Sequence, residues 1–334
     1  MSQLWFWWLA GMFTVYALLD GYDLGVGALY FWLPRNDESR GIALAAIGPV
    51  WNGNEVWLLA AGGLLVVSFP RVYALGFSGF YLALILVLWF LILRGVAIEF
   101  RGQLGHPLWK DFWDAGFGSA SLLLALLFGV ALGNLVRGLP IGANENFQGT
   151  FRLLLNPYAL AVGWLSLSLL AWHGANYLRV KTNPPLQNRV REYSRRLYLS
   201  TLAMIVIVTV YTAATGTMAS VWLHPLLLVF PLLTLAGLGL FIAAGRERDL
   251  PAFYGSMLVI AGLLGSAAAS LYPNLLRSTL NPAYSLTISN AASSPLALKA
   301  AFIANAIGLL AVIAYTYYIH RIFRGKVSTP GYHP

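Results

Sequence analysis

Long apolar runs dominate the chain and alternate with short polar segments. A helix of about 20 apolar residues is needed to cross the roughly 30 Å of hydrocarbon in a bilayer. Runs of this length recur along the chain, so the pattern predicts an all-α integral membrane protein with about nine transmembrane helices. The predicted spans are 4–33, 42–68, 74–101, 112–135, 158–178, 197–222, 225–245, 251–272 and 299–323.

The first and sixth predicted spans need separate arguments. The first run has no basic segment before it, extends beyond the apolar part of a secretion signal and contains Asp20 and Asp23. We therefore expect a retained helix rather than a cleaved signal. The break at Leu223-His224-Pro225 separates the sixth span from the seventh, because proline interrupts helical hydrogen bonding, and a tight hairpin is expected there.

The basic residues set the expected orientation, because short cytoplasmic loops retain Lys and Arg. Most of the 21 Lys and Arg residues lie in the first, third, fifth and seventh loops and in the C-terminal tail. This asymmetry predicts a periplasmic N-terminus, a cytoplasmic C-terminus and an odd number of spans. The polar segments are too short to bury cores of their own, so residues 1–334 are expected to form a single polytopic membrane domain.

The composition supports the membrane class and narrows the chemistry. The 334 residues are 59% hydrophobic and 10% charged, which is far less charge than a soluble domain carries. The net charge of +9 does not indicate a nucleic-acid partner, because the basic residues punctuate apolar runs instead of clustering on a polar domain. The absence of cysteine from the sequence excludes disulfides, thiolate metal sites and iron–sulfur clusters.

Four acidic residues fall inside apolar segments: Asp20, Asp23, Glu55 and Glu99. An ionisable group there costs at least about 2.5 kcal/mol unless it faces protein or water. Such residues are therefore functional candidates. Asp20 and Asp23 are three residues apart and share a helix face, and the same spacing relates Asn52 to Glu55.

Arg94 completes this polar group. Its separation of five residues from Glu99 places the two on different faces of one helix, so each is expected to face a different neighbour. By helix rise the group lies in the cytoplasmic half of the membrane, where carboxylates, an amide and a guanidinium suit proton uptake from the inside. An alternative stays open: buried Arg–carboxylate pairs also clamp helices together, and Asn52 can join helices by a hydrogen bond.

The histidines do not favour a haem or metal site in this chain. Four of the five histidines, His106, His224, His320 and His333, lie in loops or at the ends of spans, and only His173 lies well within a predicted span. A haem held between helices uses two histidines at matching depth. We therefore expect no cofactor and no metal to be bound by this chain.

Two weaker signals concern how the helices pack. Residues 20–24 and 173–178 are faintly similar and lie at similar depth in the first and fifth spans, which suggests two four-helix halves. Five glycines of the first two spans are interpreted as positions of close helix packing: Gly21, Gly25, Gly27, Gly62 and Gly63.

A series of ordered motifs runs through the first three spans. The motifs are DGYDLGVG from Asp20, GPVWNGNEVWL from Gly48, FPRVYA from Phe69, GFSGFY from Gly76 and RGVAIEFR from Arg94. Looser similarity continues through Trp113-Asp114, Gly133-Asn134, Leu155-Asn156-Pro157 and the C-terminal half. Together these motifs resemble subunit II of cytochrome bd-type quinol oxidases.

The resemblance implies a bacterial inner-membrane subunit of a terminal oxidase that oxidises quinol and reduces oxygen to water. In that family a haem-bearing subunit I of similar fold holds haems b and d and the quinol site. A small single-helix accessory subunit and a structural quinone are also compatible with the resemblance. It implies that subunit II forms two four-helix bundles plus a peripheral C-terminal helix and contributes to a cytoplasmic proton path at the subunit interface.

The resemblance also carries over to individual residues. Asp23, Arg94 and Glu99 match positions of the family's polar path. Many members have aspartate where this chain has Asn52 and glutamine where it has Glu55, so the titratable group is displaced by three residues; the asparagine variant resembles the cyanide-insensitive branch. We therefore expect Glu99 near the proton entrance, with the path formed by Asp20, Asp23, Asn52, Glu55, Arg94 and Glu99.

Two other functions stay open from the sequence. A secondary transporter also places acidic residues at mid-depth between repeats, and it would bind its solute without a haem-bearing partner. A scaffold without a proton function would use the same polar residues only to hold the assembly together. Purification with or without a haem-absorbing partner separates the transporter from the oxidase subunit.

Overall fold

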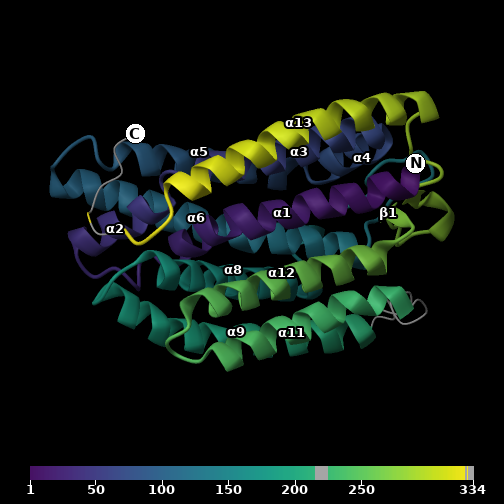
Figure 1. Ribbon diagram of the computed structural model, residues 1–334. Helices are drawn as coiled ribbons and strands as arrows, with labels where there is room; N and C mark the ends of the chain where they lie inside the picture. Colours follow the sequence, from purple (N-terminus) through teal and green to yellow (C-terminus); the bar gives the residue numbers. More distant parts are fainter. Residues whose placement is uncertain (215–224, 328, 330–334) are drawn as a thin grey trace.

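In the computed structural model, long helices run side by side in one bundle (Figure 1). The structure describes residues 1–214, 225–327 and 329, and the predicted all-α fold class is confirmed. The elements are α1 (Ser2–Ala28), α2 (Asp37–Ile47), α3 (Trp51–Ser68), α4 (Pro70–Gly79), α5 (Tyr81–Phe100), α6 (Pro107–Arg137), α7 (Phe151–Leu154), α8 (Pro157–Lys181), α9 (Leu186–Ala214), η1 (Pro225–Leu228), α11 (Val229–Ala244), α12 (Asp249–Leu271), β1 (Asn274–Leu276), η2 (Pro282–Tyr284), β2 (Leu286–Thr287) and α13 (Pro295–Ile322).

Six helices of the described residues are long and apolar enough to cross a membrane, namely α5, α6, α8, α9, α12 and α13. The number rises to seven if α2 and α3, which meet at a bend of 47°, form one span. The predicted second span is thus two helices, and the predicted third span begins in α4 and continues in α5. Apolar composition alone does not reveal these bends.

The sixth and seventh predicted spans can be compared with the structure only in part. α9 begins at Leu186, before the predicted start at 197, and α11 lies inside the predicted 225–245. Pro225 opens the short helix η1. The rest of the predicted break, Leu223-His224, and the end of the span 197–222 lie outside the described residues.

Several helix starts follow ordinary capping chemistry. The side chains of Asn36, Asn156 and Ser294 each accept a hydrogen bond from the backbone N–H three residues further on. Each bond satisfies one of the N–H groups that the first turn of a helix leaves without a partner. Pro157 and Pro295 stand at the first helical position, where no N–H is needed.

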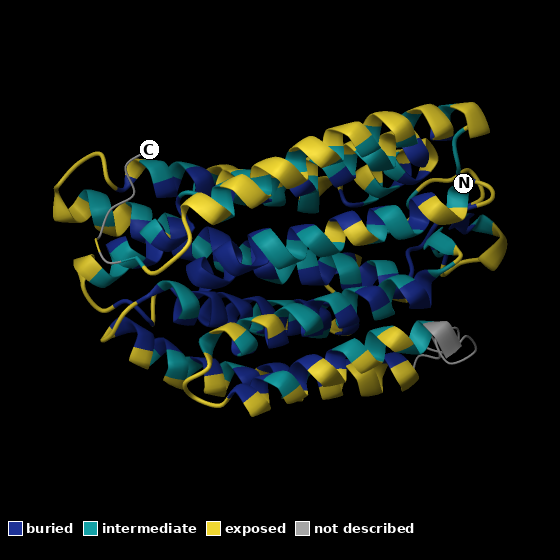
Figure 2. Ribbon diagram, in the orientation of Figure 1, coloured by how far each residue is buried: buried dark blue, intermediate teal, exposed yellow. Residues whose placement is uncertain are grey.

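The first helix is the centre of the packing. α1 packs against α3, α6, α8 and α12, while α5 packs along α6, α9 along α8 and α11 along α12. Buried residues are concentrated on α1 and α8, whereas α13 is mostly exposed and lies along one side of the bundle (Figure 2).

α1 and α8 cross with their backbones in contact. A Cβ atom at Gly25 would lie 1.9 Å from the carbonyl oxygen of Leu170, and one at Gly174 would lie 2.4 Å from the carbonyl carbon of Gly25. No other residue type allows this approach, so the glycines set the distance between the two helices.

The remaining packing glycines divide into two groups. Gly21 and Gly27 also face close neighbours on other helices, which confirms their interpretation. A Cβ atom at Gly62 or Gly63 would meet nothing within 4 Å. For these two positions the interpretation was wrong within the described chain, because they lie on the side of α3 that turns away from the bundle.

Polar contacts join the loops at the end of the bundle where α1 begins. β1 and β2 pair antiparallel there. The backbone N–H of Leu139 donates to the carbonyl of Arg277, which connects the loop after α6 to this hairpin. Arg71, at the start of α4, pairs with Glu145 and donates to the carbonyl of Asn290, so two loops are held to this helix.

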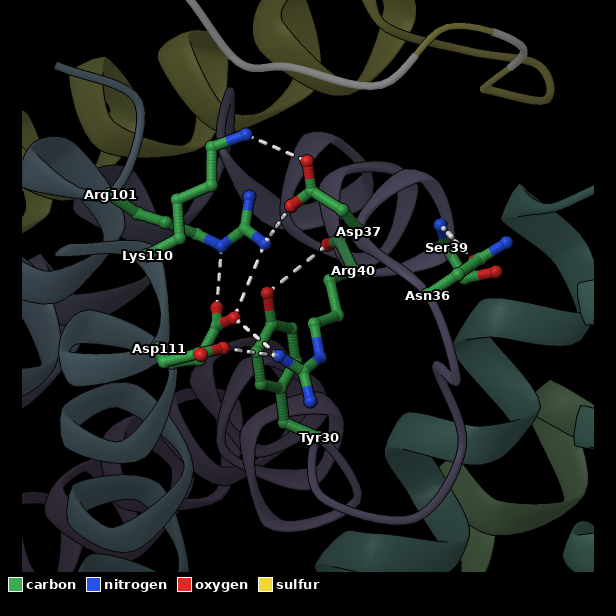
Figure 3. Close-up of polar contacts among 9 residues, drawn as sticks. Tyr30, Asn36, Asp37, Ser39, Arg40, Arg101, Lys110 and Asp111 are labelled. Atoms are coloured by element: carbon green, nitrogen blue, oxygen red, sulfur yellow. Dashed lines mark hydrogen bonds and ion pairs between the residues drawn. The ribbon is translucent and has the colours of Figure 1, made fainter. Parts of the chain in front are cut away.

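At the other end a charged network joins the starts of α2 and α6 to the end of α5 (Figure 3). Arg101 Nε lies 2.5 Å from Asp114 Oδ1, and Arg101 Nη2 lies 2.6 Å from Asp37 Oδ1. Lys110 pairs with Asp37 at 2.7 Å, and Arg40 pairs with Asp114 at 2.9 Å. Burial alone would lower the pKa of Arg101, but its hydrogen bond with Asp114 raises that pKa above its usual range.

Removing the charge of Asp114 tests this network. Asp114→Asn removes the buried carboxylate partner of Arg101 and leaves this nearly buried cation with only the exposed Asp37, and we expect a loss of about 3–5 kcal/mol in the free energy of unfolding. The matched control is Glu192→Gln, which breaks the exposed Arg196–Glu192 pair and should change little. Thermal unfolding of the purified chain compares them, and equal melting temperatures for both variants would contradict a holding function of the network.

Candidate functional site

A charged cluster lies inside the bundle where α1, α3 and α5 meet. Arg94 of α5 donates through Nη1 to Asp20 Oδ1 of α1 at 2.7 Å and through Nη2 to Glu55 Oε2 of α3 at 3.3 Å. The side chains of Arg94 and Asp20 are fully buried, and that of Glu55 is 22% exposed. One cation therefore joins carboxylates from two other helices.

Local packing places Arg94 at this point. The next residue, Gly95, faces Trp51 of α3, and a Cβ atom there would lie 3.0 Å from the tryptophan ring. The glycine lets α5 approach α3 closely enough for the guanidinium to reach Glu55.

A second set of contacts extends the cluster to Asp23. The Nδ2 atom of Asn54 lies 2.8 Å from Asp23 Oδ2 and 2.8 Å from the hydroxyl oxygen of Tyr22. The Tyr22 hydroxyl also lies 3.1 Å from Nε2 of His320 on α13. Asp20 and Asp23 share a helix face as expected, but they bind different neighbours: Arg94 of α5 and Asn54 of α3.

The cluster contains more negative than positive groups. It contains three carboxyl groups and a single guanidinium, which contacts two of them, Asp20 and Glu55. Asp20 Oδ2 and Asp23 Oδ1 are buried with no partner among the described residues. Uncompensated charge is expensive in a low-dielectric interior. The cluster therefore holds more carboxyl groups than its one cation can pair with, and a carboxyl group can in principle accept or donate a proton.

Glu99 and Asn52 lie apart from this cluster. Glu99 is half-buried on α5, and among the described residues no ion pair or hydrogen bond joins its side chain to Arg94, as their spacing predicts. Asn52 is exposed on the outer side of α3. Both remain predictions as members of a path, since no contact in the described chain links them to the buried carboxylates.

Sequence reasoning passed over Asn54, the amide that contacts a buried carboxylate. The signal was available in the helical spacing: Trp51, Asn54, Trp57 and Ala61 form the buried stripe of α3. An asparagine on a stripe of large apolar residues needs a partner inside the protein. His320 gave no such signal, because its contact with Tyr22 joins residues that are 298 positions apart.

His173 lies inside the bundle and uses both ring nitrogens. Nε2 donates to the carbonyl of Leu18 at 3.0 Å, and Nδ1 lies 2.8 Å from the hydroxyl of Ser256. Its ring stacks on Phe253, so the side chain joins α1, α8 and α12. In the part of the chain that the structure describes, no group of three His, Asp or Glu residues is placed to hold a metal.

A double-mutant cycle tests the ion pair at the centre of the cluster. Asp20→Asn or Arg94→Met alone leaves a buried charge without its partner, and each should lower the free energy of unfolding by about 3–5 kcal/mol. The double variant removes both charges and should cost clearly less than the sum. Thermal unfolding of the three variants gives the coupling, and additive losses would show that the pair is not energetically linked.

Comparison with known proteins shows which proteins the chain is similar to. A family model described as cytochrome bd terminal oxidase subunit II matches residues 1–323. The probable cytochrome oxidase subunit 2 of Haemophilus influenzae is 34% identical over 96% of this chain and 94% of its own length. The cytochrome bd-I ubiquinol oxidase subunit 2 of Escherichia coli is 32% identical over the same shares. The bd oxidase structure from Geobacillus thermodenitrificans has a similar fold, with a TM-score of 0.79, 19% identity and coverage of 96% of this chain and 98% of that one.

Proposed function

The chain belongs to the cytochrome bd terminal oxidase subunit II family, and from this premise we propose that it supports a haem-bearing subunit I and carries part of a proton path from the cytoplasm. As a family member it is a multi-pass inner-membrane subunit of an oxygen-reducing quinol oxidase complex. Reduction of oxygen to water consumes protons as well as electrons. A complex that performs it within a membrane needs a route for those protons.

The proposed route begins near Glu99, continues through Glu55 and Asn52, and is tuned by Asp23, Asp20 and Arg94. The single observation that carries it is the position of Glu55. Its side chain is 22% exposed, yet it is ion-paired with the wholly buried Arg94. A carboxyl group in this position can take a proton from the helix surface and pass it toward the buried Asp20 and Asp23.

The proposed topology has nine spans, a periplasmic N-terminus and a cytoplasmic C-terminus. Two features support it: the start of α1 and the end of α13 lie at opposite ends of the bundle, which an odd number of spans requires (Figure 1), and most basic residues fall in loops assigned to one side. The proposal also has two four-helix bundles, α1 with α3, α5 and α6 and then α8 with α9, α11 and α12, plus a peripheral α13. The two bundles would meet where α8 packs against α1 and α6.

In this proposal haems b and d and the site of quinol oxidation belong to subunit I. The histidines within the described bundle, His173 and His320, use their ring nitrogens for hydrogen bonds inside the chain. A structural quinone and a single-helix accessory subunit are compatible with this division. Family membership decides against a stand-alone secondary transporter.

Subunit I is proposed to dock on the outer side of α3. The exposed positions there form one continuous helical stripe, listed here from the cytoplasmic end: Asn52, Val56, Leu59, Gly63 and Val66. An amide that faced hydrocarbon would lose its hydrogen bonds with water, so Asn52 favours a protein neighbour. Gly63 leaves room for a helix of that neighbour to approach.

Charge-removing substitutions test the path. Glu55→Gln and Glu99→Gln keep the side-chain shape but cannot release a proton, and we expect quinol oxidase turnover of the assembled complex to fall by about 10²-fold. Glu38→Gln, at an exposed position of α2, is the control and should keep normal turnover. Haem content is measured in parallel: normal turnover with full haem would remove that glutamate from the path, and loss of haem would favour a scaffold without a proton function.

A bulky side chain on the stripe tests the docking face. Gly63→Trp should reduce the amount of haem-bearing subunit that co-purifies with this chain, because the ring fills the space a partner helix needs. Gly239→Trp is a matched control, since Gly239 is also an exposed helical glycine with nothing within 4 Å, but on α11. Equal haem recovery with both variants would exclude the α3 stripe as the docking face.

A further inference from the structure

The last helix reaches the buried cluster through His320. Its Nδ1 atom lies 2.8 Å from the carbonyl oxygen of Thr316, and its Nε2 atom lies 3.1 Å from the hydroxyl oxygen of Tyr22. A carbonyl oxygen only accepts hydrogen bonds, so the hydrogen of a neutral ring is on Nδ1. Nε2 is then an acceptor, and the Tyr22 hydroxyl donates to it.

This direction fixes the bonds that follow. With its hydrogen directed to His320, the Tyr22 oxygen accepts from Nδ2 of Asn54 at 2.8 Å. The same amide donates to Asp23 Oδ2, also at 2.8 Å. A continuous series of hydrogen bonds therefore runs from α13 through α1 and α3 to a buried carboxyl group.

The end of α13 that carries His320 is held against the bundle, although Leu298 is the only residue of this helix that is fully buried. The carbonyl of Phe323 accepts a hydrogen bond from Lys181 Nζ, and the backbone N–H of Val327 donates to the carbonyl of Lys181. These contacts attach the segment after α13 to the end of α8. They keep the imidazole of His320 beside Tyr22.

We propose that His320 is a positioning residue for Asp23, acting through Tyr22 and Asn54; this inference rests on the proposed proton path. When the imidazole takes up a proton from water, Nε2 changes from acceptor to donor. The Tyr22 oxygen must then accept from His320, and its own hydrogen turns away from α13. The protonation state of His320, at the cytoplasmic end of α13, thereby determines which hydrogen-bond donors surround Asp23. Release of that proton restores the first arrangement.

Among the described residues, His320 is the imidazole whose ring nitrogen contacts the Tyr22 hydroxyl. On α8, Tyr177 stacks on Tyr22 with ring centroids 4.0 Å apart, and His173 is engaged by Leu18 and Ser256. On α3, Glu55 is held by Arg94. The other charged or titratable groups near this end are Asp23 on α1, Lys181 on α8, and Tyr317, Arg321 and Arg324 on and after α13.

The test measures quinol oxidase turnover of the full complex between about pH 5 and 8, where imidazoles change charge. His320→Gln keeps an acceptor for Tyr22 but cannot titrate. The turnover of His320→Gln divided by that of the wild type should be constant at the alkaline end of this range and should change toward the acid end. His106→Gln, at an exposed position, is the control and should give a constant ratio.

Two further variants remove the contact itself. His320→Leu and Tyr22→Phe should each lower turnover several-fold at neutral pH with normal haem content, and the double variant should lose no more than either single variant. If His320→Leu does not assemble, His320→Gln and Tyr22→Phe still decide, because both keep the size of the native side chain. A constant turnover ratio for His320→Gln, or wild-type turnover for Tyr22→Phe, would overturn the proposal.

The glutamate variants separate this inference from the path it rests on. If Glu55→Gln lowers turnover while the His320 ratio is constant across pH, the path stands and the function of His320 is refuted. If the Glu55, Glu99 and His320 variants all behave as wild type, the proton path itself is refuted.

Discussion

The buried ion pair between Arg94 and Asp20 is the constraint on which the inner part of this protein depends. A guanidinium with no exposed surface requires a carboxylate within reach, so α5 cannot shift along α1 without leaving a charge unpaired in the membrane. Glu55 adds the same requirement for α3. Such a pair adds little net stability compared with apolar residues of equal size. What it contributes is register, because Arg94 reaches both Asp20 and Glu55 in only one arrangement of the three helices.

The ends of the bundle are held by different means. The Arg101–Asp114 network fixes the ends of α2, α5 and α6 (Figure 3), and the loops beside β1 are joined by backbone bonds and by Arg71. Between these two levels, the glycine contact of α1 with α8 needs no polar group at all. The polar side chains in the middle are therefore not required for general cohesion. The acceptor atoms of Asp20 and Asp23 that have no partner among the described residues support the proposed proton path.

The apolar pattern was sufficient to predict helices, and the cost of charge in hydrocarbon drew attention to Asp20, Glu55 and Arg94, which the structure brings into contact. Neither could predict the bend between α2 and α3 or the separate helix α4, because a broken span and a straight one have the same composition. Helical spacing defines faces within a helix but not which neighbour each face meets. Asn52 and Asn54 lie about 200° apart around the helix axis, so choosing the wrong asparagine moves the amide from the inside to the outside. The contact of Tyr22 with His320 depends on how the last helix returns to the first, which no local pattern encodes.

The two aspartates of α1 show how one helix face can serve two functions. Asp20 is paired with a permanent cation, the guanidinium of Arg94. Asp23, one turn on, binds an amide instead. An amide can donate to a carboxylate but cannot neutralise it or release a proton, so Asp23 is oriented without being compensated. A carboxyl group in that state depends on protons for its neutrality inside the membrane. In the proposed path, a group that changes the donors around Asp23, through Tyr22 from α13 or through Glu55 from the surface of α3, would act on the proton itself and not on the packing of the helices.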